Sequence, residues 1–241
     1  MDPKYSERYR QLFENHWWWR ARSEVILEKL SELFPRVGRE RILDIGCGDG
    51  LFFERLARFG EIEGVEPAAE LVSENNPNRK RIHICPFDER FQPGKQYSLI
   101  LMLDVLEHLE NPVGALRQVE SLLEPGGRLV ATVPAFMALW TNHDVLNHHQ
   151  TRYTKASFRA IAGQTGLRIE EERYLYHWTY PVKLGVRALE RLTRSEPVPA
   201  KVPARWINEM LYRISRIEQR TVTRLPMPFG SSLLIVARKV A

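Results

Sequence analysis

The chain has only two cysteines among its 241 residues, and no apolar run approaches the ~18 residues needed to span a bilayer. Cys47 and Cys85 lie in short apolar stretches rather than in paired-spacing motifs, which excludes a disulfide framework and a thiolate zinc site. The first residues are polar and charged, unlike a signal peptide. We therefore expect a cytoplasmic protein, with peripheral contact at the inner membrane face left open.

The chain also lacks a large excess of charge of either sign. Its 35 Lys and Arg residues against 30 Asp and Glu residues leave a net charge of +5. The excess is uneven, because residues 171–241 hold 13 basic and 6 acidic side chains, whereas residues 1–170 hold 22 and 24. A basic C-terminal part can face nucleic acid or a membrane, or simply form a solvated helix surface.

Short segments rich in Ile, Leu and Val alternate with helical stretches between residues 41 and 133. The apolar segments are 41–46, 61–66, 81–87, 97–103 and 127–133, the helical stretches are 51–59 and 113–123, and an amphipathic helix is predicted over 18–34. This alternation is typical of βαβ units and predicts an α/β fold, with helices on both faces of a parallel sheet. Ligands of such sheets bind beyond the carboxyl ends of the strands.

The pattern changes after residue 134, where a His-rich loop precedes a predicted helix over 155–165. Two more predicted strands, 167–176 and 231–239, are separated by residues 177–230. This insert is too long for an ordinary loop, so we expect a helical lid or substrate cap. The predicted organisation is a helical extension (1–37), a main domain (38–176 and 231–241) and a helical insert (177–230).

The insert contains a predicted basic amphipathic helix, residues 205–224. One side carries Ile207, Met210, Leu211, Ile214, Ile217 and Thr221, and another carries Arg213, Arg216, Arg220 and Arg224. We expect the apolar stripe to pack on the main domain. Contact with an anionic membrane or a lipid-linked substrate is the alternative. Nucleic acid is disfavoured, because the segment lacks interleaved aromatic residues.

The most specific motif is ILDIGCGDG, residues 42–50, between a predicted strand and a predicted helix. Its glycines allow a tight turn and the close approach of a ligand. A dinucleotide site requires GxGxxG, whereas this spacing is GxGxG with Leu51 at the last position. Asp44, two residues before the first glycine, would repel a phosphate and suits a cationic ligand.

DIGCGDG resembles the first motif of the class I S-adenosylmethionine-dependent methyltransferases, here of the bacterial small-molecule type. The resemblance implies a Rossmann-like fold with seven mostly parallel strands, the last one antiparallel. It also implies S-adenosylmethionine as the cofactor, with S-adenosylhomocysteine as product. The residues expected at the cofactor are Asp44, Gly46, Cys47, Gly48, Glu66, Phe87, Asp88, Leu103 and Asp104. Among these, Glu66 would bind the ribose hydroxyls, Asp88 the adenine amino group, and Phe87 would stack on adenine.

Two segments supply candidates on the acceptor side. DVLEHL contains His108, and NHDVLNHHQTRYT, residues 142–154, contains His149; both histidines are candidate bases, with a structural or cofactor-shell role for His108 as the alternative. The second segment resembles a loop common in bacterial members, which makes Asp144, Arg152 and Tyr153 candidate substrate residues. The alternative is that Thr154 caps the next helix and Tyr153 packs beneath it. We expect no metal site, because ligand spacing is undefined in a loop and no cysteine supports one.

Three successive tryptophans occur in HWWWRAR, residues 16–22, and they cannot all face one side of a helix. Members with a similar tract roof the cofactor with this helix, and Arg20 or Arg22 could then pair with the methionine carboxylate. Packing of the helix on the sheet is the alternative.

These observations predict methyl transfer to a small-molecule, lipid-linked or glycan-linked acceptor, most simply at oxygen. N- or C-methylation, or a cofactor-binding protein without turnover, are the alternatives. The patterns predict neither the acceptor's identity nor the oligomeric state.

Overall fold

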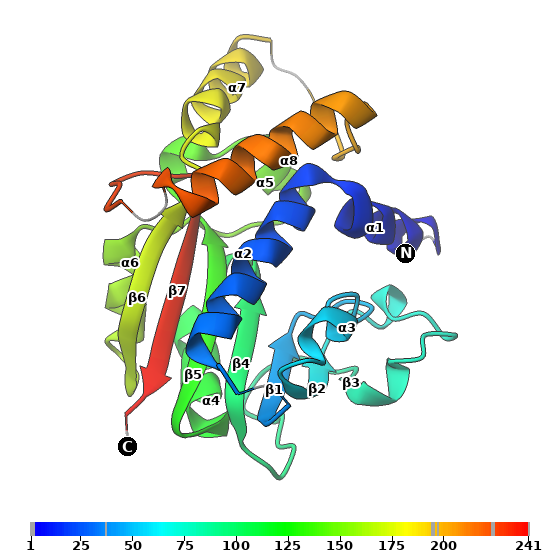
Figure 1. The fold of residues 1–241 in the computed structure, drawn as a ribbon, viewed down its shortest axis with the longest axis vertical. Coiled ribbons are helices and arrows are strands. Elements are labelled where there is room, and N and C mark those ends of the chain that lie inside the picture. The colour runs from blue at the N-terminus through cyan, green and yellow to red at the C-terminus, as the bar shows by residue number, and fades with distance from the viewer. Residues whose placement is uncertain (1–2, 37, 194–195, 197, 223–224, 241) are drawn as a thin grey trace.

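A computed structural model describes residues 3–36, 38–193, 196, 198–222 and 225–240 (Figure 1). Seven strands form one sheet in the order β3-β2-β1-β4-β5-β7-β6. Their bounds are β1 Glu40–Ile45, β2 Gly60–Val65, β3 Ile82–His83, β4 Tyr97–Leu103, β5 Leu123–Pro134, β6 Leu167–Leu175 and β7 Ser232–Lys239. Strands β1 to β5 pair in parallel, and β7 lies antiparallel between β5 and β6. The predicted α/β fold with an antiparallel last strand is confirmed.

Helices cover both faces of the sheet (Figure 1). The longer helices are α1 Pro3–Asn15, α2 Trp17–Leu33, α4 Pro112–Leu122, α6 Lys155–Ala162, α7 Thr179–Thr193 and α8 Arg205–Arg220. One hydrophobic cluster joins α2 to one face, and another joins α4 and α6 to the opposite face. Residues 99–102 of the central strand β4 are completely buried, which explains why this strand has a continuous rather than an alternating apolar pattern.

Two predicted elements are shorter than the sequence pattern suggests. Strand β3 comprises only two of the residues 81–87, because it lies at the sheet edge and Pro86 has no N–H to continue a ladder. The helix expected over 51–59 is reduced to α3, Phe53–Leu56. The turn that ends the glycine-rich loop, closed by Phe53 N–H donating to the Gly50 carbonyl, delays its start.

The segment expected to be a His-rich loop contains a short helix, α5, Asn142–Leu146. A capping box begins it, in which the Thr141 side chain accepts from the backbone N–H of Asp144 and the Asp144 carboxylate accepts from the backbone N–H of Thr141. His148 then adopts a left-handed conformation with φ of 55°. After this turn the next residue, His149, contacts Asp144 of α5.

The insert forms α7 and α8, but α8 is oriented opposite to the prediction. Its buried residues are polar or charged: Asn208, Ser215, Arg216, Glu218 and Gln219. Its apolar residues Met210, Ile214 and Ile217 are 45%, 39% and 64% exposed. The expectation that the apolar stripe packs on the main domain was therefore wrong. Arg224 lies outside the described residues.

Polar contacts explain this orientation of α8. Arg216 forms an ion pair with Glu28 of α2, and Asn208 accepts a hydrogen bond from the Trp17 backbone N–H at 2.8 Å. The Glu218 carboxylate accepts backbone N–H donors at the start of the insert, from residues 177 and 178. Since these groups need protein partners once buried, they fix the polar side inward.

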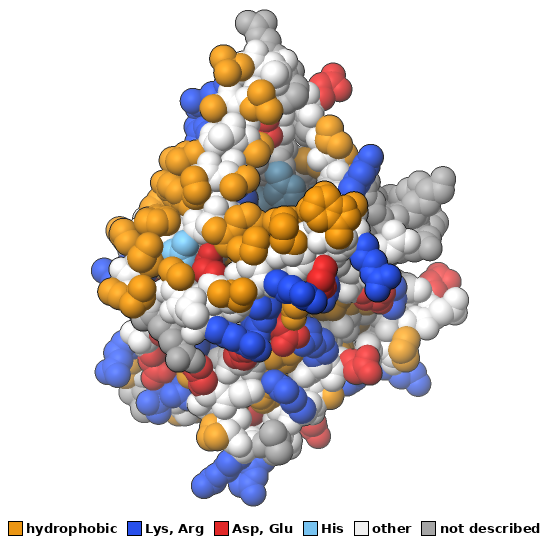
Figure 2. Space-filling view, turned by 45° about the horizontal axis from the view of Figure 1, so that its top comes forward, with side chains coloured by type: hydrophobic (Ala, Val, Ile, Leu, Met, Phe, Trp, Pro, Cys, Tyr) orange, Lys and Arg blue, Asp and Glu red, His pale blue; other side chains and the backbone are white. Residues whose placement is uncertain are grey.

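The outward side of the insert is a hydrophobic surface, shown as a band across Figure 2. We call it the insert face; it comprises Val182, Leu184, Val186, Leu189 and Leu192 of α7, and Trp206, Met210, Ile214 and Ile217 of α8. Trp206 is 70% exposed. Within the described part of the chain, none of the helices has the length and hydropathy of a membrane span.

Candidate active site

The glycine-rich loop connects β1 to α3 at the carboxyl edge of the sheet. The Gly46 N–H donates to the Val65 carbonyl at 2.8 Å, which ties the loop to β2. Gly46 has a φ of 71°, and a Cβ there would lie 2.7 Å from a methyl carbon of Val105. Both the left-handed backbone and the approach of the segment after β4 therefore require glycine at this position.

Glu66 follows β2 and reaches the same loop. One carboxylate oxygen accepts from the Gly48 N–H at 2.9 Å, and the other accepts from the Ala68 N–H at 2.9 Å. Burial raises the pKa of Glu66, and these two hydrogen bonds partly offset that rise. The carboxylate is thus held beside Gly48, while Cys47 packs its sulfur against Gly64 of β2.

Two more carboxylates lie near this loop, at the ends of β1 and β4. Asp44 is 5% exposed, and burial raises its pKa to about 7; Arg22 opposes the rise and Glu66 adds to it. Asp104, directly after Leu103 at the end of β4, forms an ion pair with Arg22 at 2.7 Å between Oδ2 and Nε. Three carboxylates against one guanidinium leave a net negative site, which suits a cationic ligand.

The two candidate arginines of the tryptophan tract have different partners. Arg22 is buried and contacts Asp104, whereas Arg20 pairs with Glu209 of α8 at 3.2 Å and lies 4.0 Å over the Tyr212 ring. The structure therefore brings Arg22, and not Arg20, to the carboxylates. Trp17 and Trp18 pack against Tyr176, as the packing alternative proposed.

Helix α1 lies over the glycine-rich loop, which no sequence motif indicated. A Cβ on Gly48 would lie 3.7 Å from a ring carbon of Tyr9, and the Tyr9 hydroxyl is hydrogen-bonded to the Trp19 side chain. Arg10 forms an ion pair with Asp49 of the loop. The only sequence signal for this arrangement was the neighbouring tryptophan tract.

Phe87 and Asp88 follow β3, at the outer end of the same edge. The Asp88 carboxylate is bound by Arg90, whose hydrogen bonds lower the pKa of Asp88. Phe87 is partly buried, with its ring 6.0 Å from that of Phe91. Since β2 and β3 are paired in parallel, these residues and Glu66 leave neighbouring strand ends.

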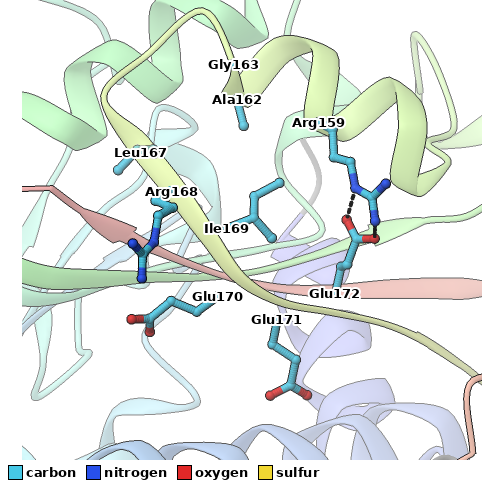
Figure 3. A pocket seen from close by; sticks show the side chains of 9 residues that line it. All are labelled: Arg159, Ala162, Gly163, Leu167, Arg168, Ile169, Glu170, Glu171 and Glu172. Atoms are coloured by element: carbon cyan, nitrogen blue, oxygen red, sulfur yellow. Dashed lines mark hydrogen bonds and ion pairs between the residues drawn. The ribbon is translucent and has the colours of Figure 1, made fainter.

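A separate pocket lies between α6 and the edge strand β6, where Arg159 pairs with Glu172 (Figure 3). None of the predicted site residues lines it. It is therefore separate from the candidate site.

The two candidate bases are brought together from distant segments. The His108 and His149 rings lie 4.7 Å apart between centroids and nearly perpendicular. His149 Nδ1 lies 2.8 Å from Asp144, and Arg152 donates to both oxygens of the same carboxylate at 2.8 and 2.9 Å. Burial opposes ionisation of Asp144, but the bonds from His149 and Arg152 hold its pKa well below the usual range.

The other residues of this segment have internal partners. The Tyr153 hydroxyl donates to the Leu106 carbonyl at 3.1 Å, and the Tyr153 ring lies 6.0 Å from that of Phe158. Thr154 is the N-cap of α6 and accepts from the Ser157 N–H. The contacts of Tyr153 and Thr154 are those expected if the segment has a packing role. The side chains of Asp144 and Arg152 are likewise hydrogen-bonded to each other.

Glu107 was not predicted, although it stands beside His108 in the sequence. Its side chain is fully buried, and burial, with Asp104 adding, raises its pKa well above the usual range. Its adjacency to a histidine was the only available signal, because burial of an acid cannot be read from sequence.

Comparison with known proteins identifies methyltransferases as the relatives of this chain. Residues 18–172 match the family model described as a methyltransferase domain. The ubiquinone biosynthesis O-methyltransferase of Hydrogenovibrio crunogenus is 25% identical over 174 residues, 66% of this chain and 67% of that protein. Other relatives with this name are matched over as little as 39% of their length.

Solved structures share the fold. A chain in the complex of the Haloferax volcanii Trm112 methyltransferase activator with a methyltransferase has a TM-score of 0.61 at 17% identity, covering 99% of this chain and 95% of that one. A SAM-dependent methyltransferase of Archaeoglobus fulgidus has a TM-score of 0.56 at 20% identity, covering 90% and 94%. With the family match over more than half of its length, the chain belongs to the methyltransferase-domain family and is a class I S-adenosylmethionine-dependent methyltransferase.

Proposed function

We propose that this methyltransferase acts at oxygen on a small acceptor carried by a lipid, at the surface of an anionic membrane. The proposal of a lipid-linked acceptor rests on the orientation of α8, which buries its polar side and exposes its apolar side. The name shared by the curated relatives supports the choice of oxygen.

The residues around the glycine-rich loop fit S-adenosylmethionine. At the left-handed Gly48 a Cβ would lie no closer than 3.7 Å to a non-neighbouring residue, so a ligand can approach the backbone there, and Asp44, Glu66 and Asp104 offer negative charge to a sulfonium and an ammonium group. Glu66 would hold the ribose hydroxyls and Arg22 the methionine carboxylate. Tyr9 and Arg10 of α1 would cover the bound molecule and exclude water.

When bound, S-adenosylmethionine supplies an electrophilic methyl group, so this chain must position the acceptor and help it lose a proton. His108 lies in the segment that follows β4, His149 follows α5, and their rings are 4.7 Å apart. Burial lowers the pKa of His108, so its imidazole is neutral at physiological pH. The two imidazoles would assist deprotonation of a hydroxyl, either by accepting the proton or by binding an ion that acidifies it.

The insert face suits a membrane surface in both polarity and charge. A large continuous apolar area on a soluble protein marks an interaction site. The exposed charged residues around it are mostly basic: Arg191, Lys201, Arg205, Arg213 and Arg220 against Glu196. A cation near an anionic surface contributes about 1 kcal/mol, and the apolar side chains add their burial in the interface.

Vesicle co-sedimentation of the full chain tests the membrane surface. We expect pelleting with phosphatidylglycerol vesicles at low salt, weaker pelleting at high salt, and loss of pelleting in Trp206→Ser/Ile217→Ser. Phe87→Ser, a change of a partly buried aromatic residue outside the insert, serves as the control. Absence of pelleting at low salt would contradict the membrane proposal. A lysate extract incubated with methyl-labelled donor tests the acceptor: label should enter the organic phase as a methyl ether.

A further inference from the structure

Three potential metal ligands converge beside the glycine-rich loop. A carboxylate oxygen of Glu107, a ring nitrogen of His108 and a ring nitrogen of His149 all lie within 4.8 Å of one another. Glu107 and His108 belong to the segment between β4 and α4, and His149 follows α5. The expectation of no metal site considered the His-rich segment alone, and it did not include an acid from another segment.

Glu107 gives this cluster an observation that points to a cation. Its side chain has no exposed surface, and neither carboxylate oxygen accepts a hydrogen bond from another residue among those described. Among the charged groups that act on it, the like-charged Asp104 has a larger effect than Arg22 or Arg152. Buried polar groups normally have partners, and burying a carboxylate without one is strongly unfavourable. A bound cation would supply the missing partner.

The histidines are held as metal-binding histidines usually are. His149 directs Nδ1 to Asp144 at 2.8 Å, which leaves Nε2 for a ligand bond. The Asp144 carboxylate is in turn fixed by Arg152, so their charges are matched. The His108 ring is hydrogen-bonded to the Asn147 backbone. Such outer contacts set the tautomer and orientation of metal-binding imidazoles.

We propose that Glu107, His108 and His149 bind one divalent first-row transition ion, of the Mn²⁺, Fe²⁺ or Zn²⁺ class. Two imidazoles with one carboxylate favour such ions over Mg²⁺ or Ca²⁺, which prefer oxygen ligands throughout. Three protein ligands leave coordination positions open. The site is thus suited to bind a further molecule rather than only to stabilise the fold.

The location gives this site a role in acceptor recognition, and this part rests on the proposed O-methylation. Val105, two residues before Glu107, touches Gly46 of the glycine-rich loop. Open positions on the ion would accept two neighbouring oxygen atoms of the acceptor, such as a vicinal diol or an ortho-dihydroxy ring. A hydroxyl bound to the ion would release its proton to solvent water more readily, which leaves an oxygen anion on the ion.

Titration of the chelator-treated full chain with Co²⁺ tests the site directly, because visible absorption reports nitrogen and oxygen ligation. We expect saturation at one equivalent, and competition by Zn²⁺ and Mn²⁺. Glu107→Gln and His149→Gln should weaken Co²⁺ binding at least 100-fold, whereas His148→Asn, which changes the neighbouring exposed histidine at a left-handed position, should leave it unchanged. Binding of S-adenosylhomocysteine to every variant verifies folding.

Absence of one-equivalent binding, or unchanged Co²⁺ affinity in both ligand variants, would overturn the proposal. The outcomes separate it from the proposed function. Metal binding without methyl ether formation would leave the site intact and remove the O-methylation. If protein that binds no Co²⁺ still forms the methyl ether after chelator treatment, the O-methylation would stand and the metal site would be removed.

Discussion

Asp144 and Arg152 form a buried ion pair in which the guanidinium donates to both carboxylate oxygens, at 2.8 and 2.9 Å. Both side chains are almost completely inaccessible. The same carboxylate is hydrogen-bonded to the His149 ring and is part of the capping box at the start of α5. One residue therefore supports both the local fold and the orientation of a candidate site histidine.

Removing this carboxylate should be strongly destabilising, because it leaves the Arg152 charge buried without a partner. We expect Asp144→Ala to lower the free energy of unfolding by about 3–5 kcal/mol, measured by urea denaturation at pH 7. Asp88→Asn, at an exposed ion pair, should leave the urea midpoint unchanged. Since the pKa of Asp144 is lowered on folding, its contribution is present at neutral pH and lost under acid conditions. A urea midpoint of Asp144→Ala equal to wild type would show that the pair does not stabilise the fold.

Glu66 should contribute to binding through the ribose. Glu66→Ala removes a charged acceptor, and a hydrogen bond to a charged group contributes about 1.5–3 kcal/mol, equivalent to roughly 10- to 150-fold in affinity. The loss should be similar for S-adenosylmethionine and S-adenosylhomocysteine, since both carry the ribose; titration calorimetry measures it. Glu70→Gln, on the exposed turn that follows, is the matched control. A loss confined to S-adenosylmethionine would place Glu66 near the sulfonium instead.

Asp44 should make cofactor binding depend on pH. Its pKa in the free protein is about 7, raised by burial, and a cationic ligand favours the ionised form. Affinity for S-adenosylmethionine should therefore rise as the pH rises through about 7, with uptake of the ligand releasing a proton. Calorimetry between pH 6 and 8 in buffers of different ionisation enthalpy measures both effects. A pH dependence that persists in Asp44→Asn would assign it to another group.

The roof formed by α1 should affect cofactor affinity more than stability. Tyr9→Ala/Arg10→Ala removes the ring over Gly48 and the ion pair with Asp49, and we expect at least a 10-fold weaker affinity for S-adenosylhomocysteine. The urea midpoint should change little, because α1 lies outside the two main hydrophobic clusters apart from Phe13. Gln11→Ala, an exposed position of the same helix, is the control. Unchanged affinity in the double variant would exclude a roof.

Much of the fold could be predicted because its signals are local. Continuous apolar segments mark strands buried on both faces, and the left-handed glycines of the first loop have no substitute that the backbone tolerates. The positions of Asp44, near the end of β1, and Glu66, directly after β2, could be predicted from where those strands end. Their convergence follows from parallel pairing, which brings strand ends to one edge.

The features that only the tertiary structure decided are contacts between residues distant in the sequence. The choice of Arg22 over Arg20 follows from which side of α2 faces the strand ends, and the arrangement of α1 over Gly48 follows from its packing. The amphipathic pattern of α8 was correct, but amphipathicity does not specify which side is buried when polar partners on α2 compete for it. Likewise, Glu107 and His149 become neighbours only because two loops meet at one sheet edge, and burial then leaves an acid without a partner.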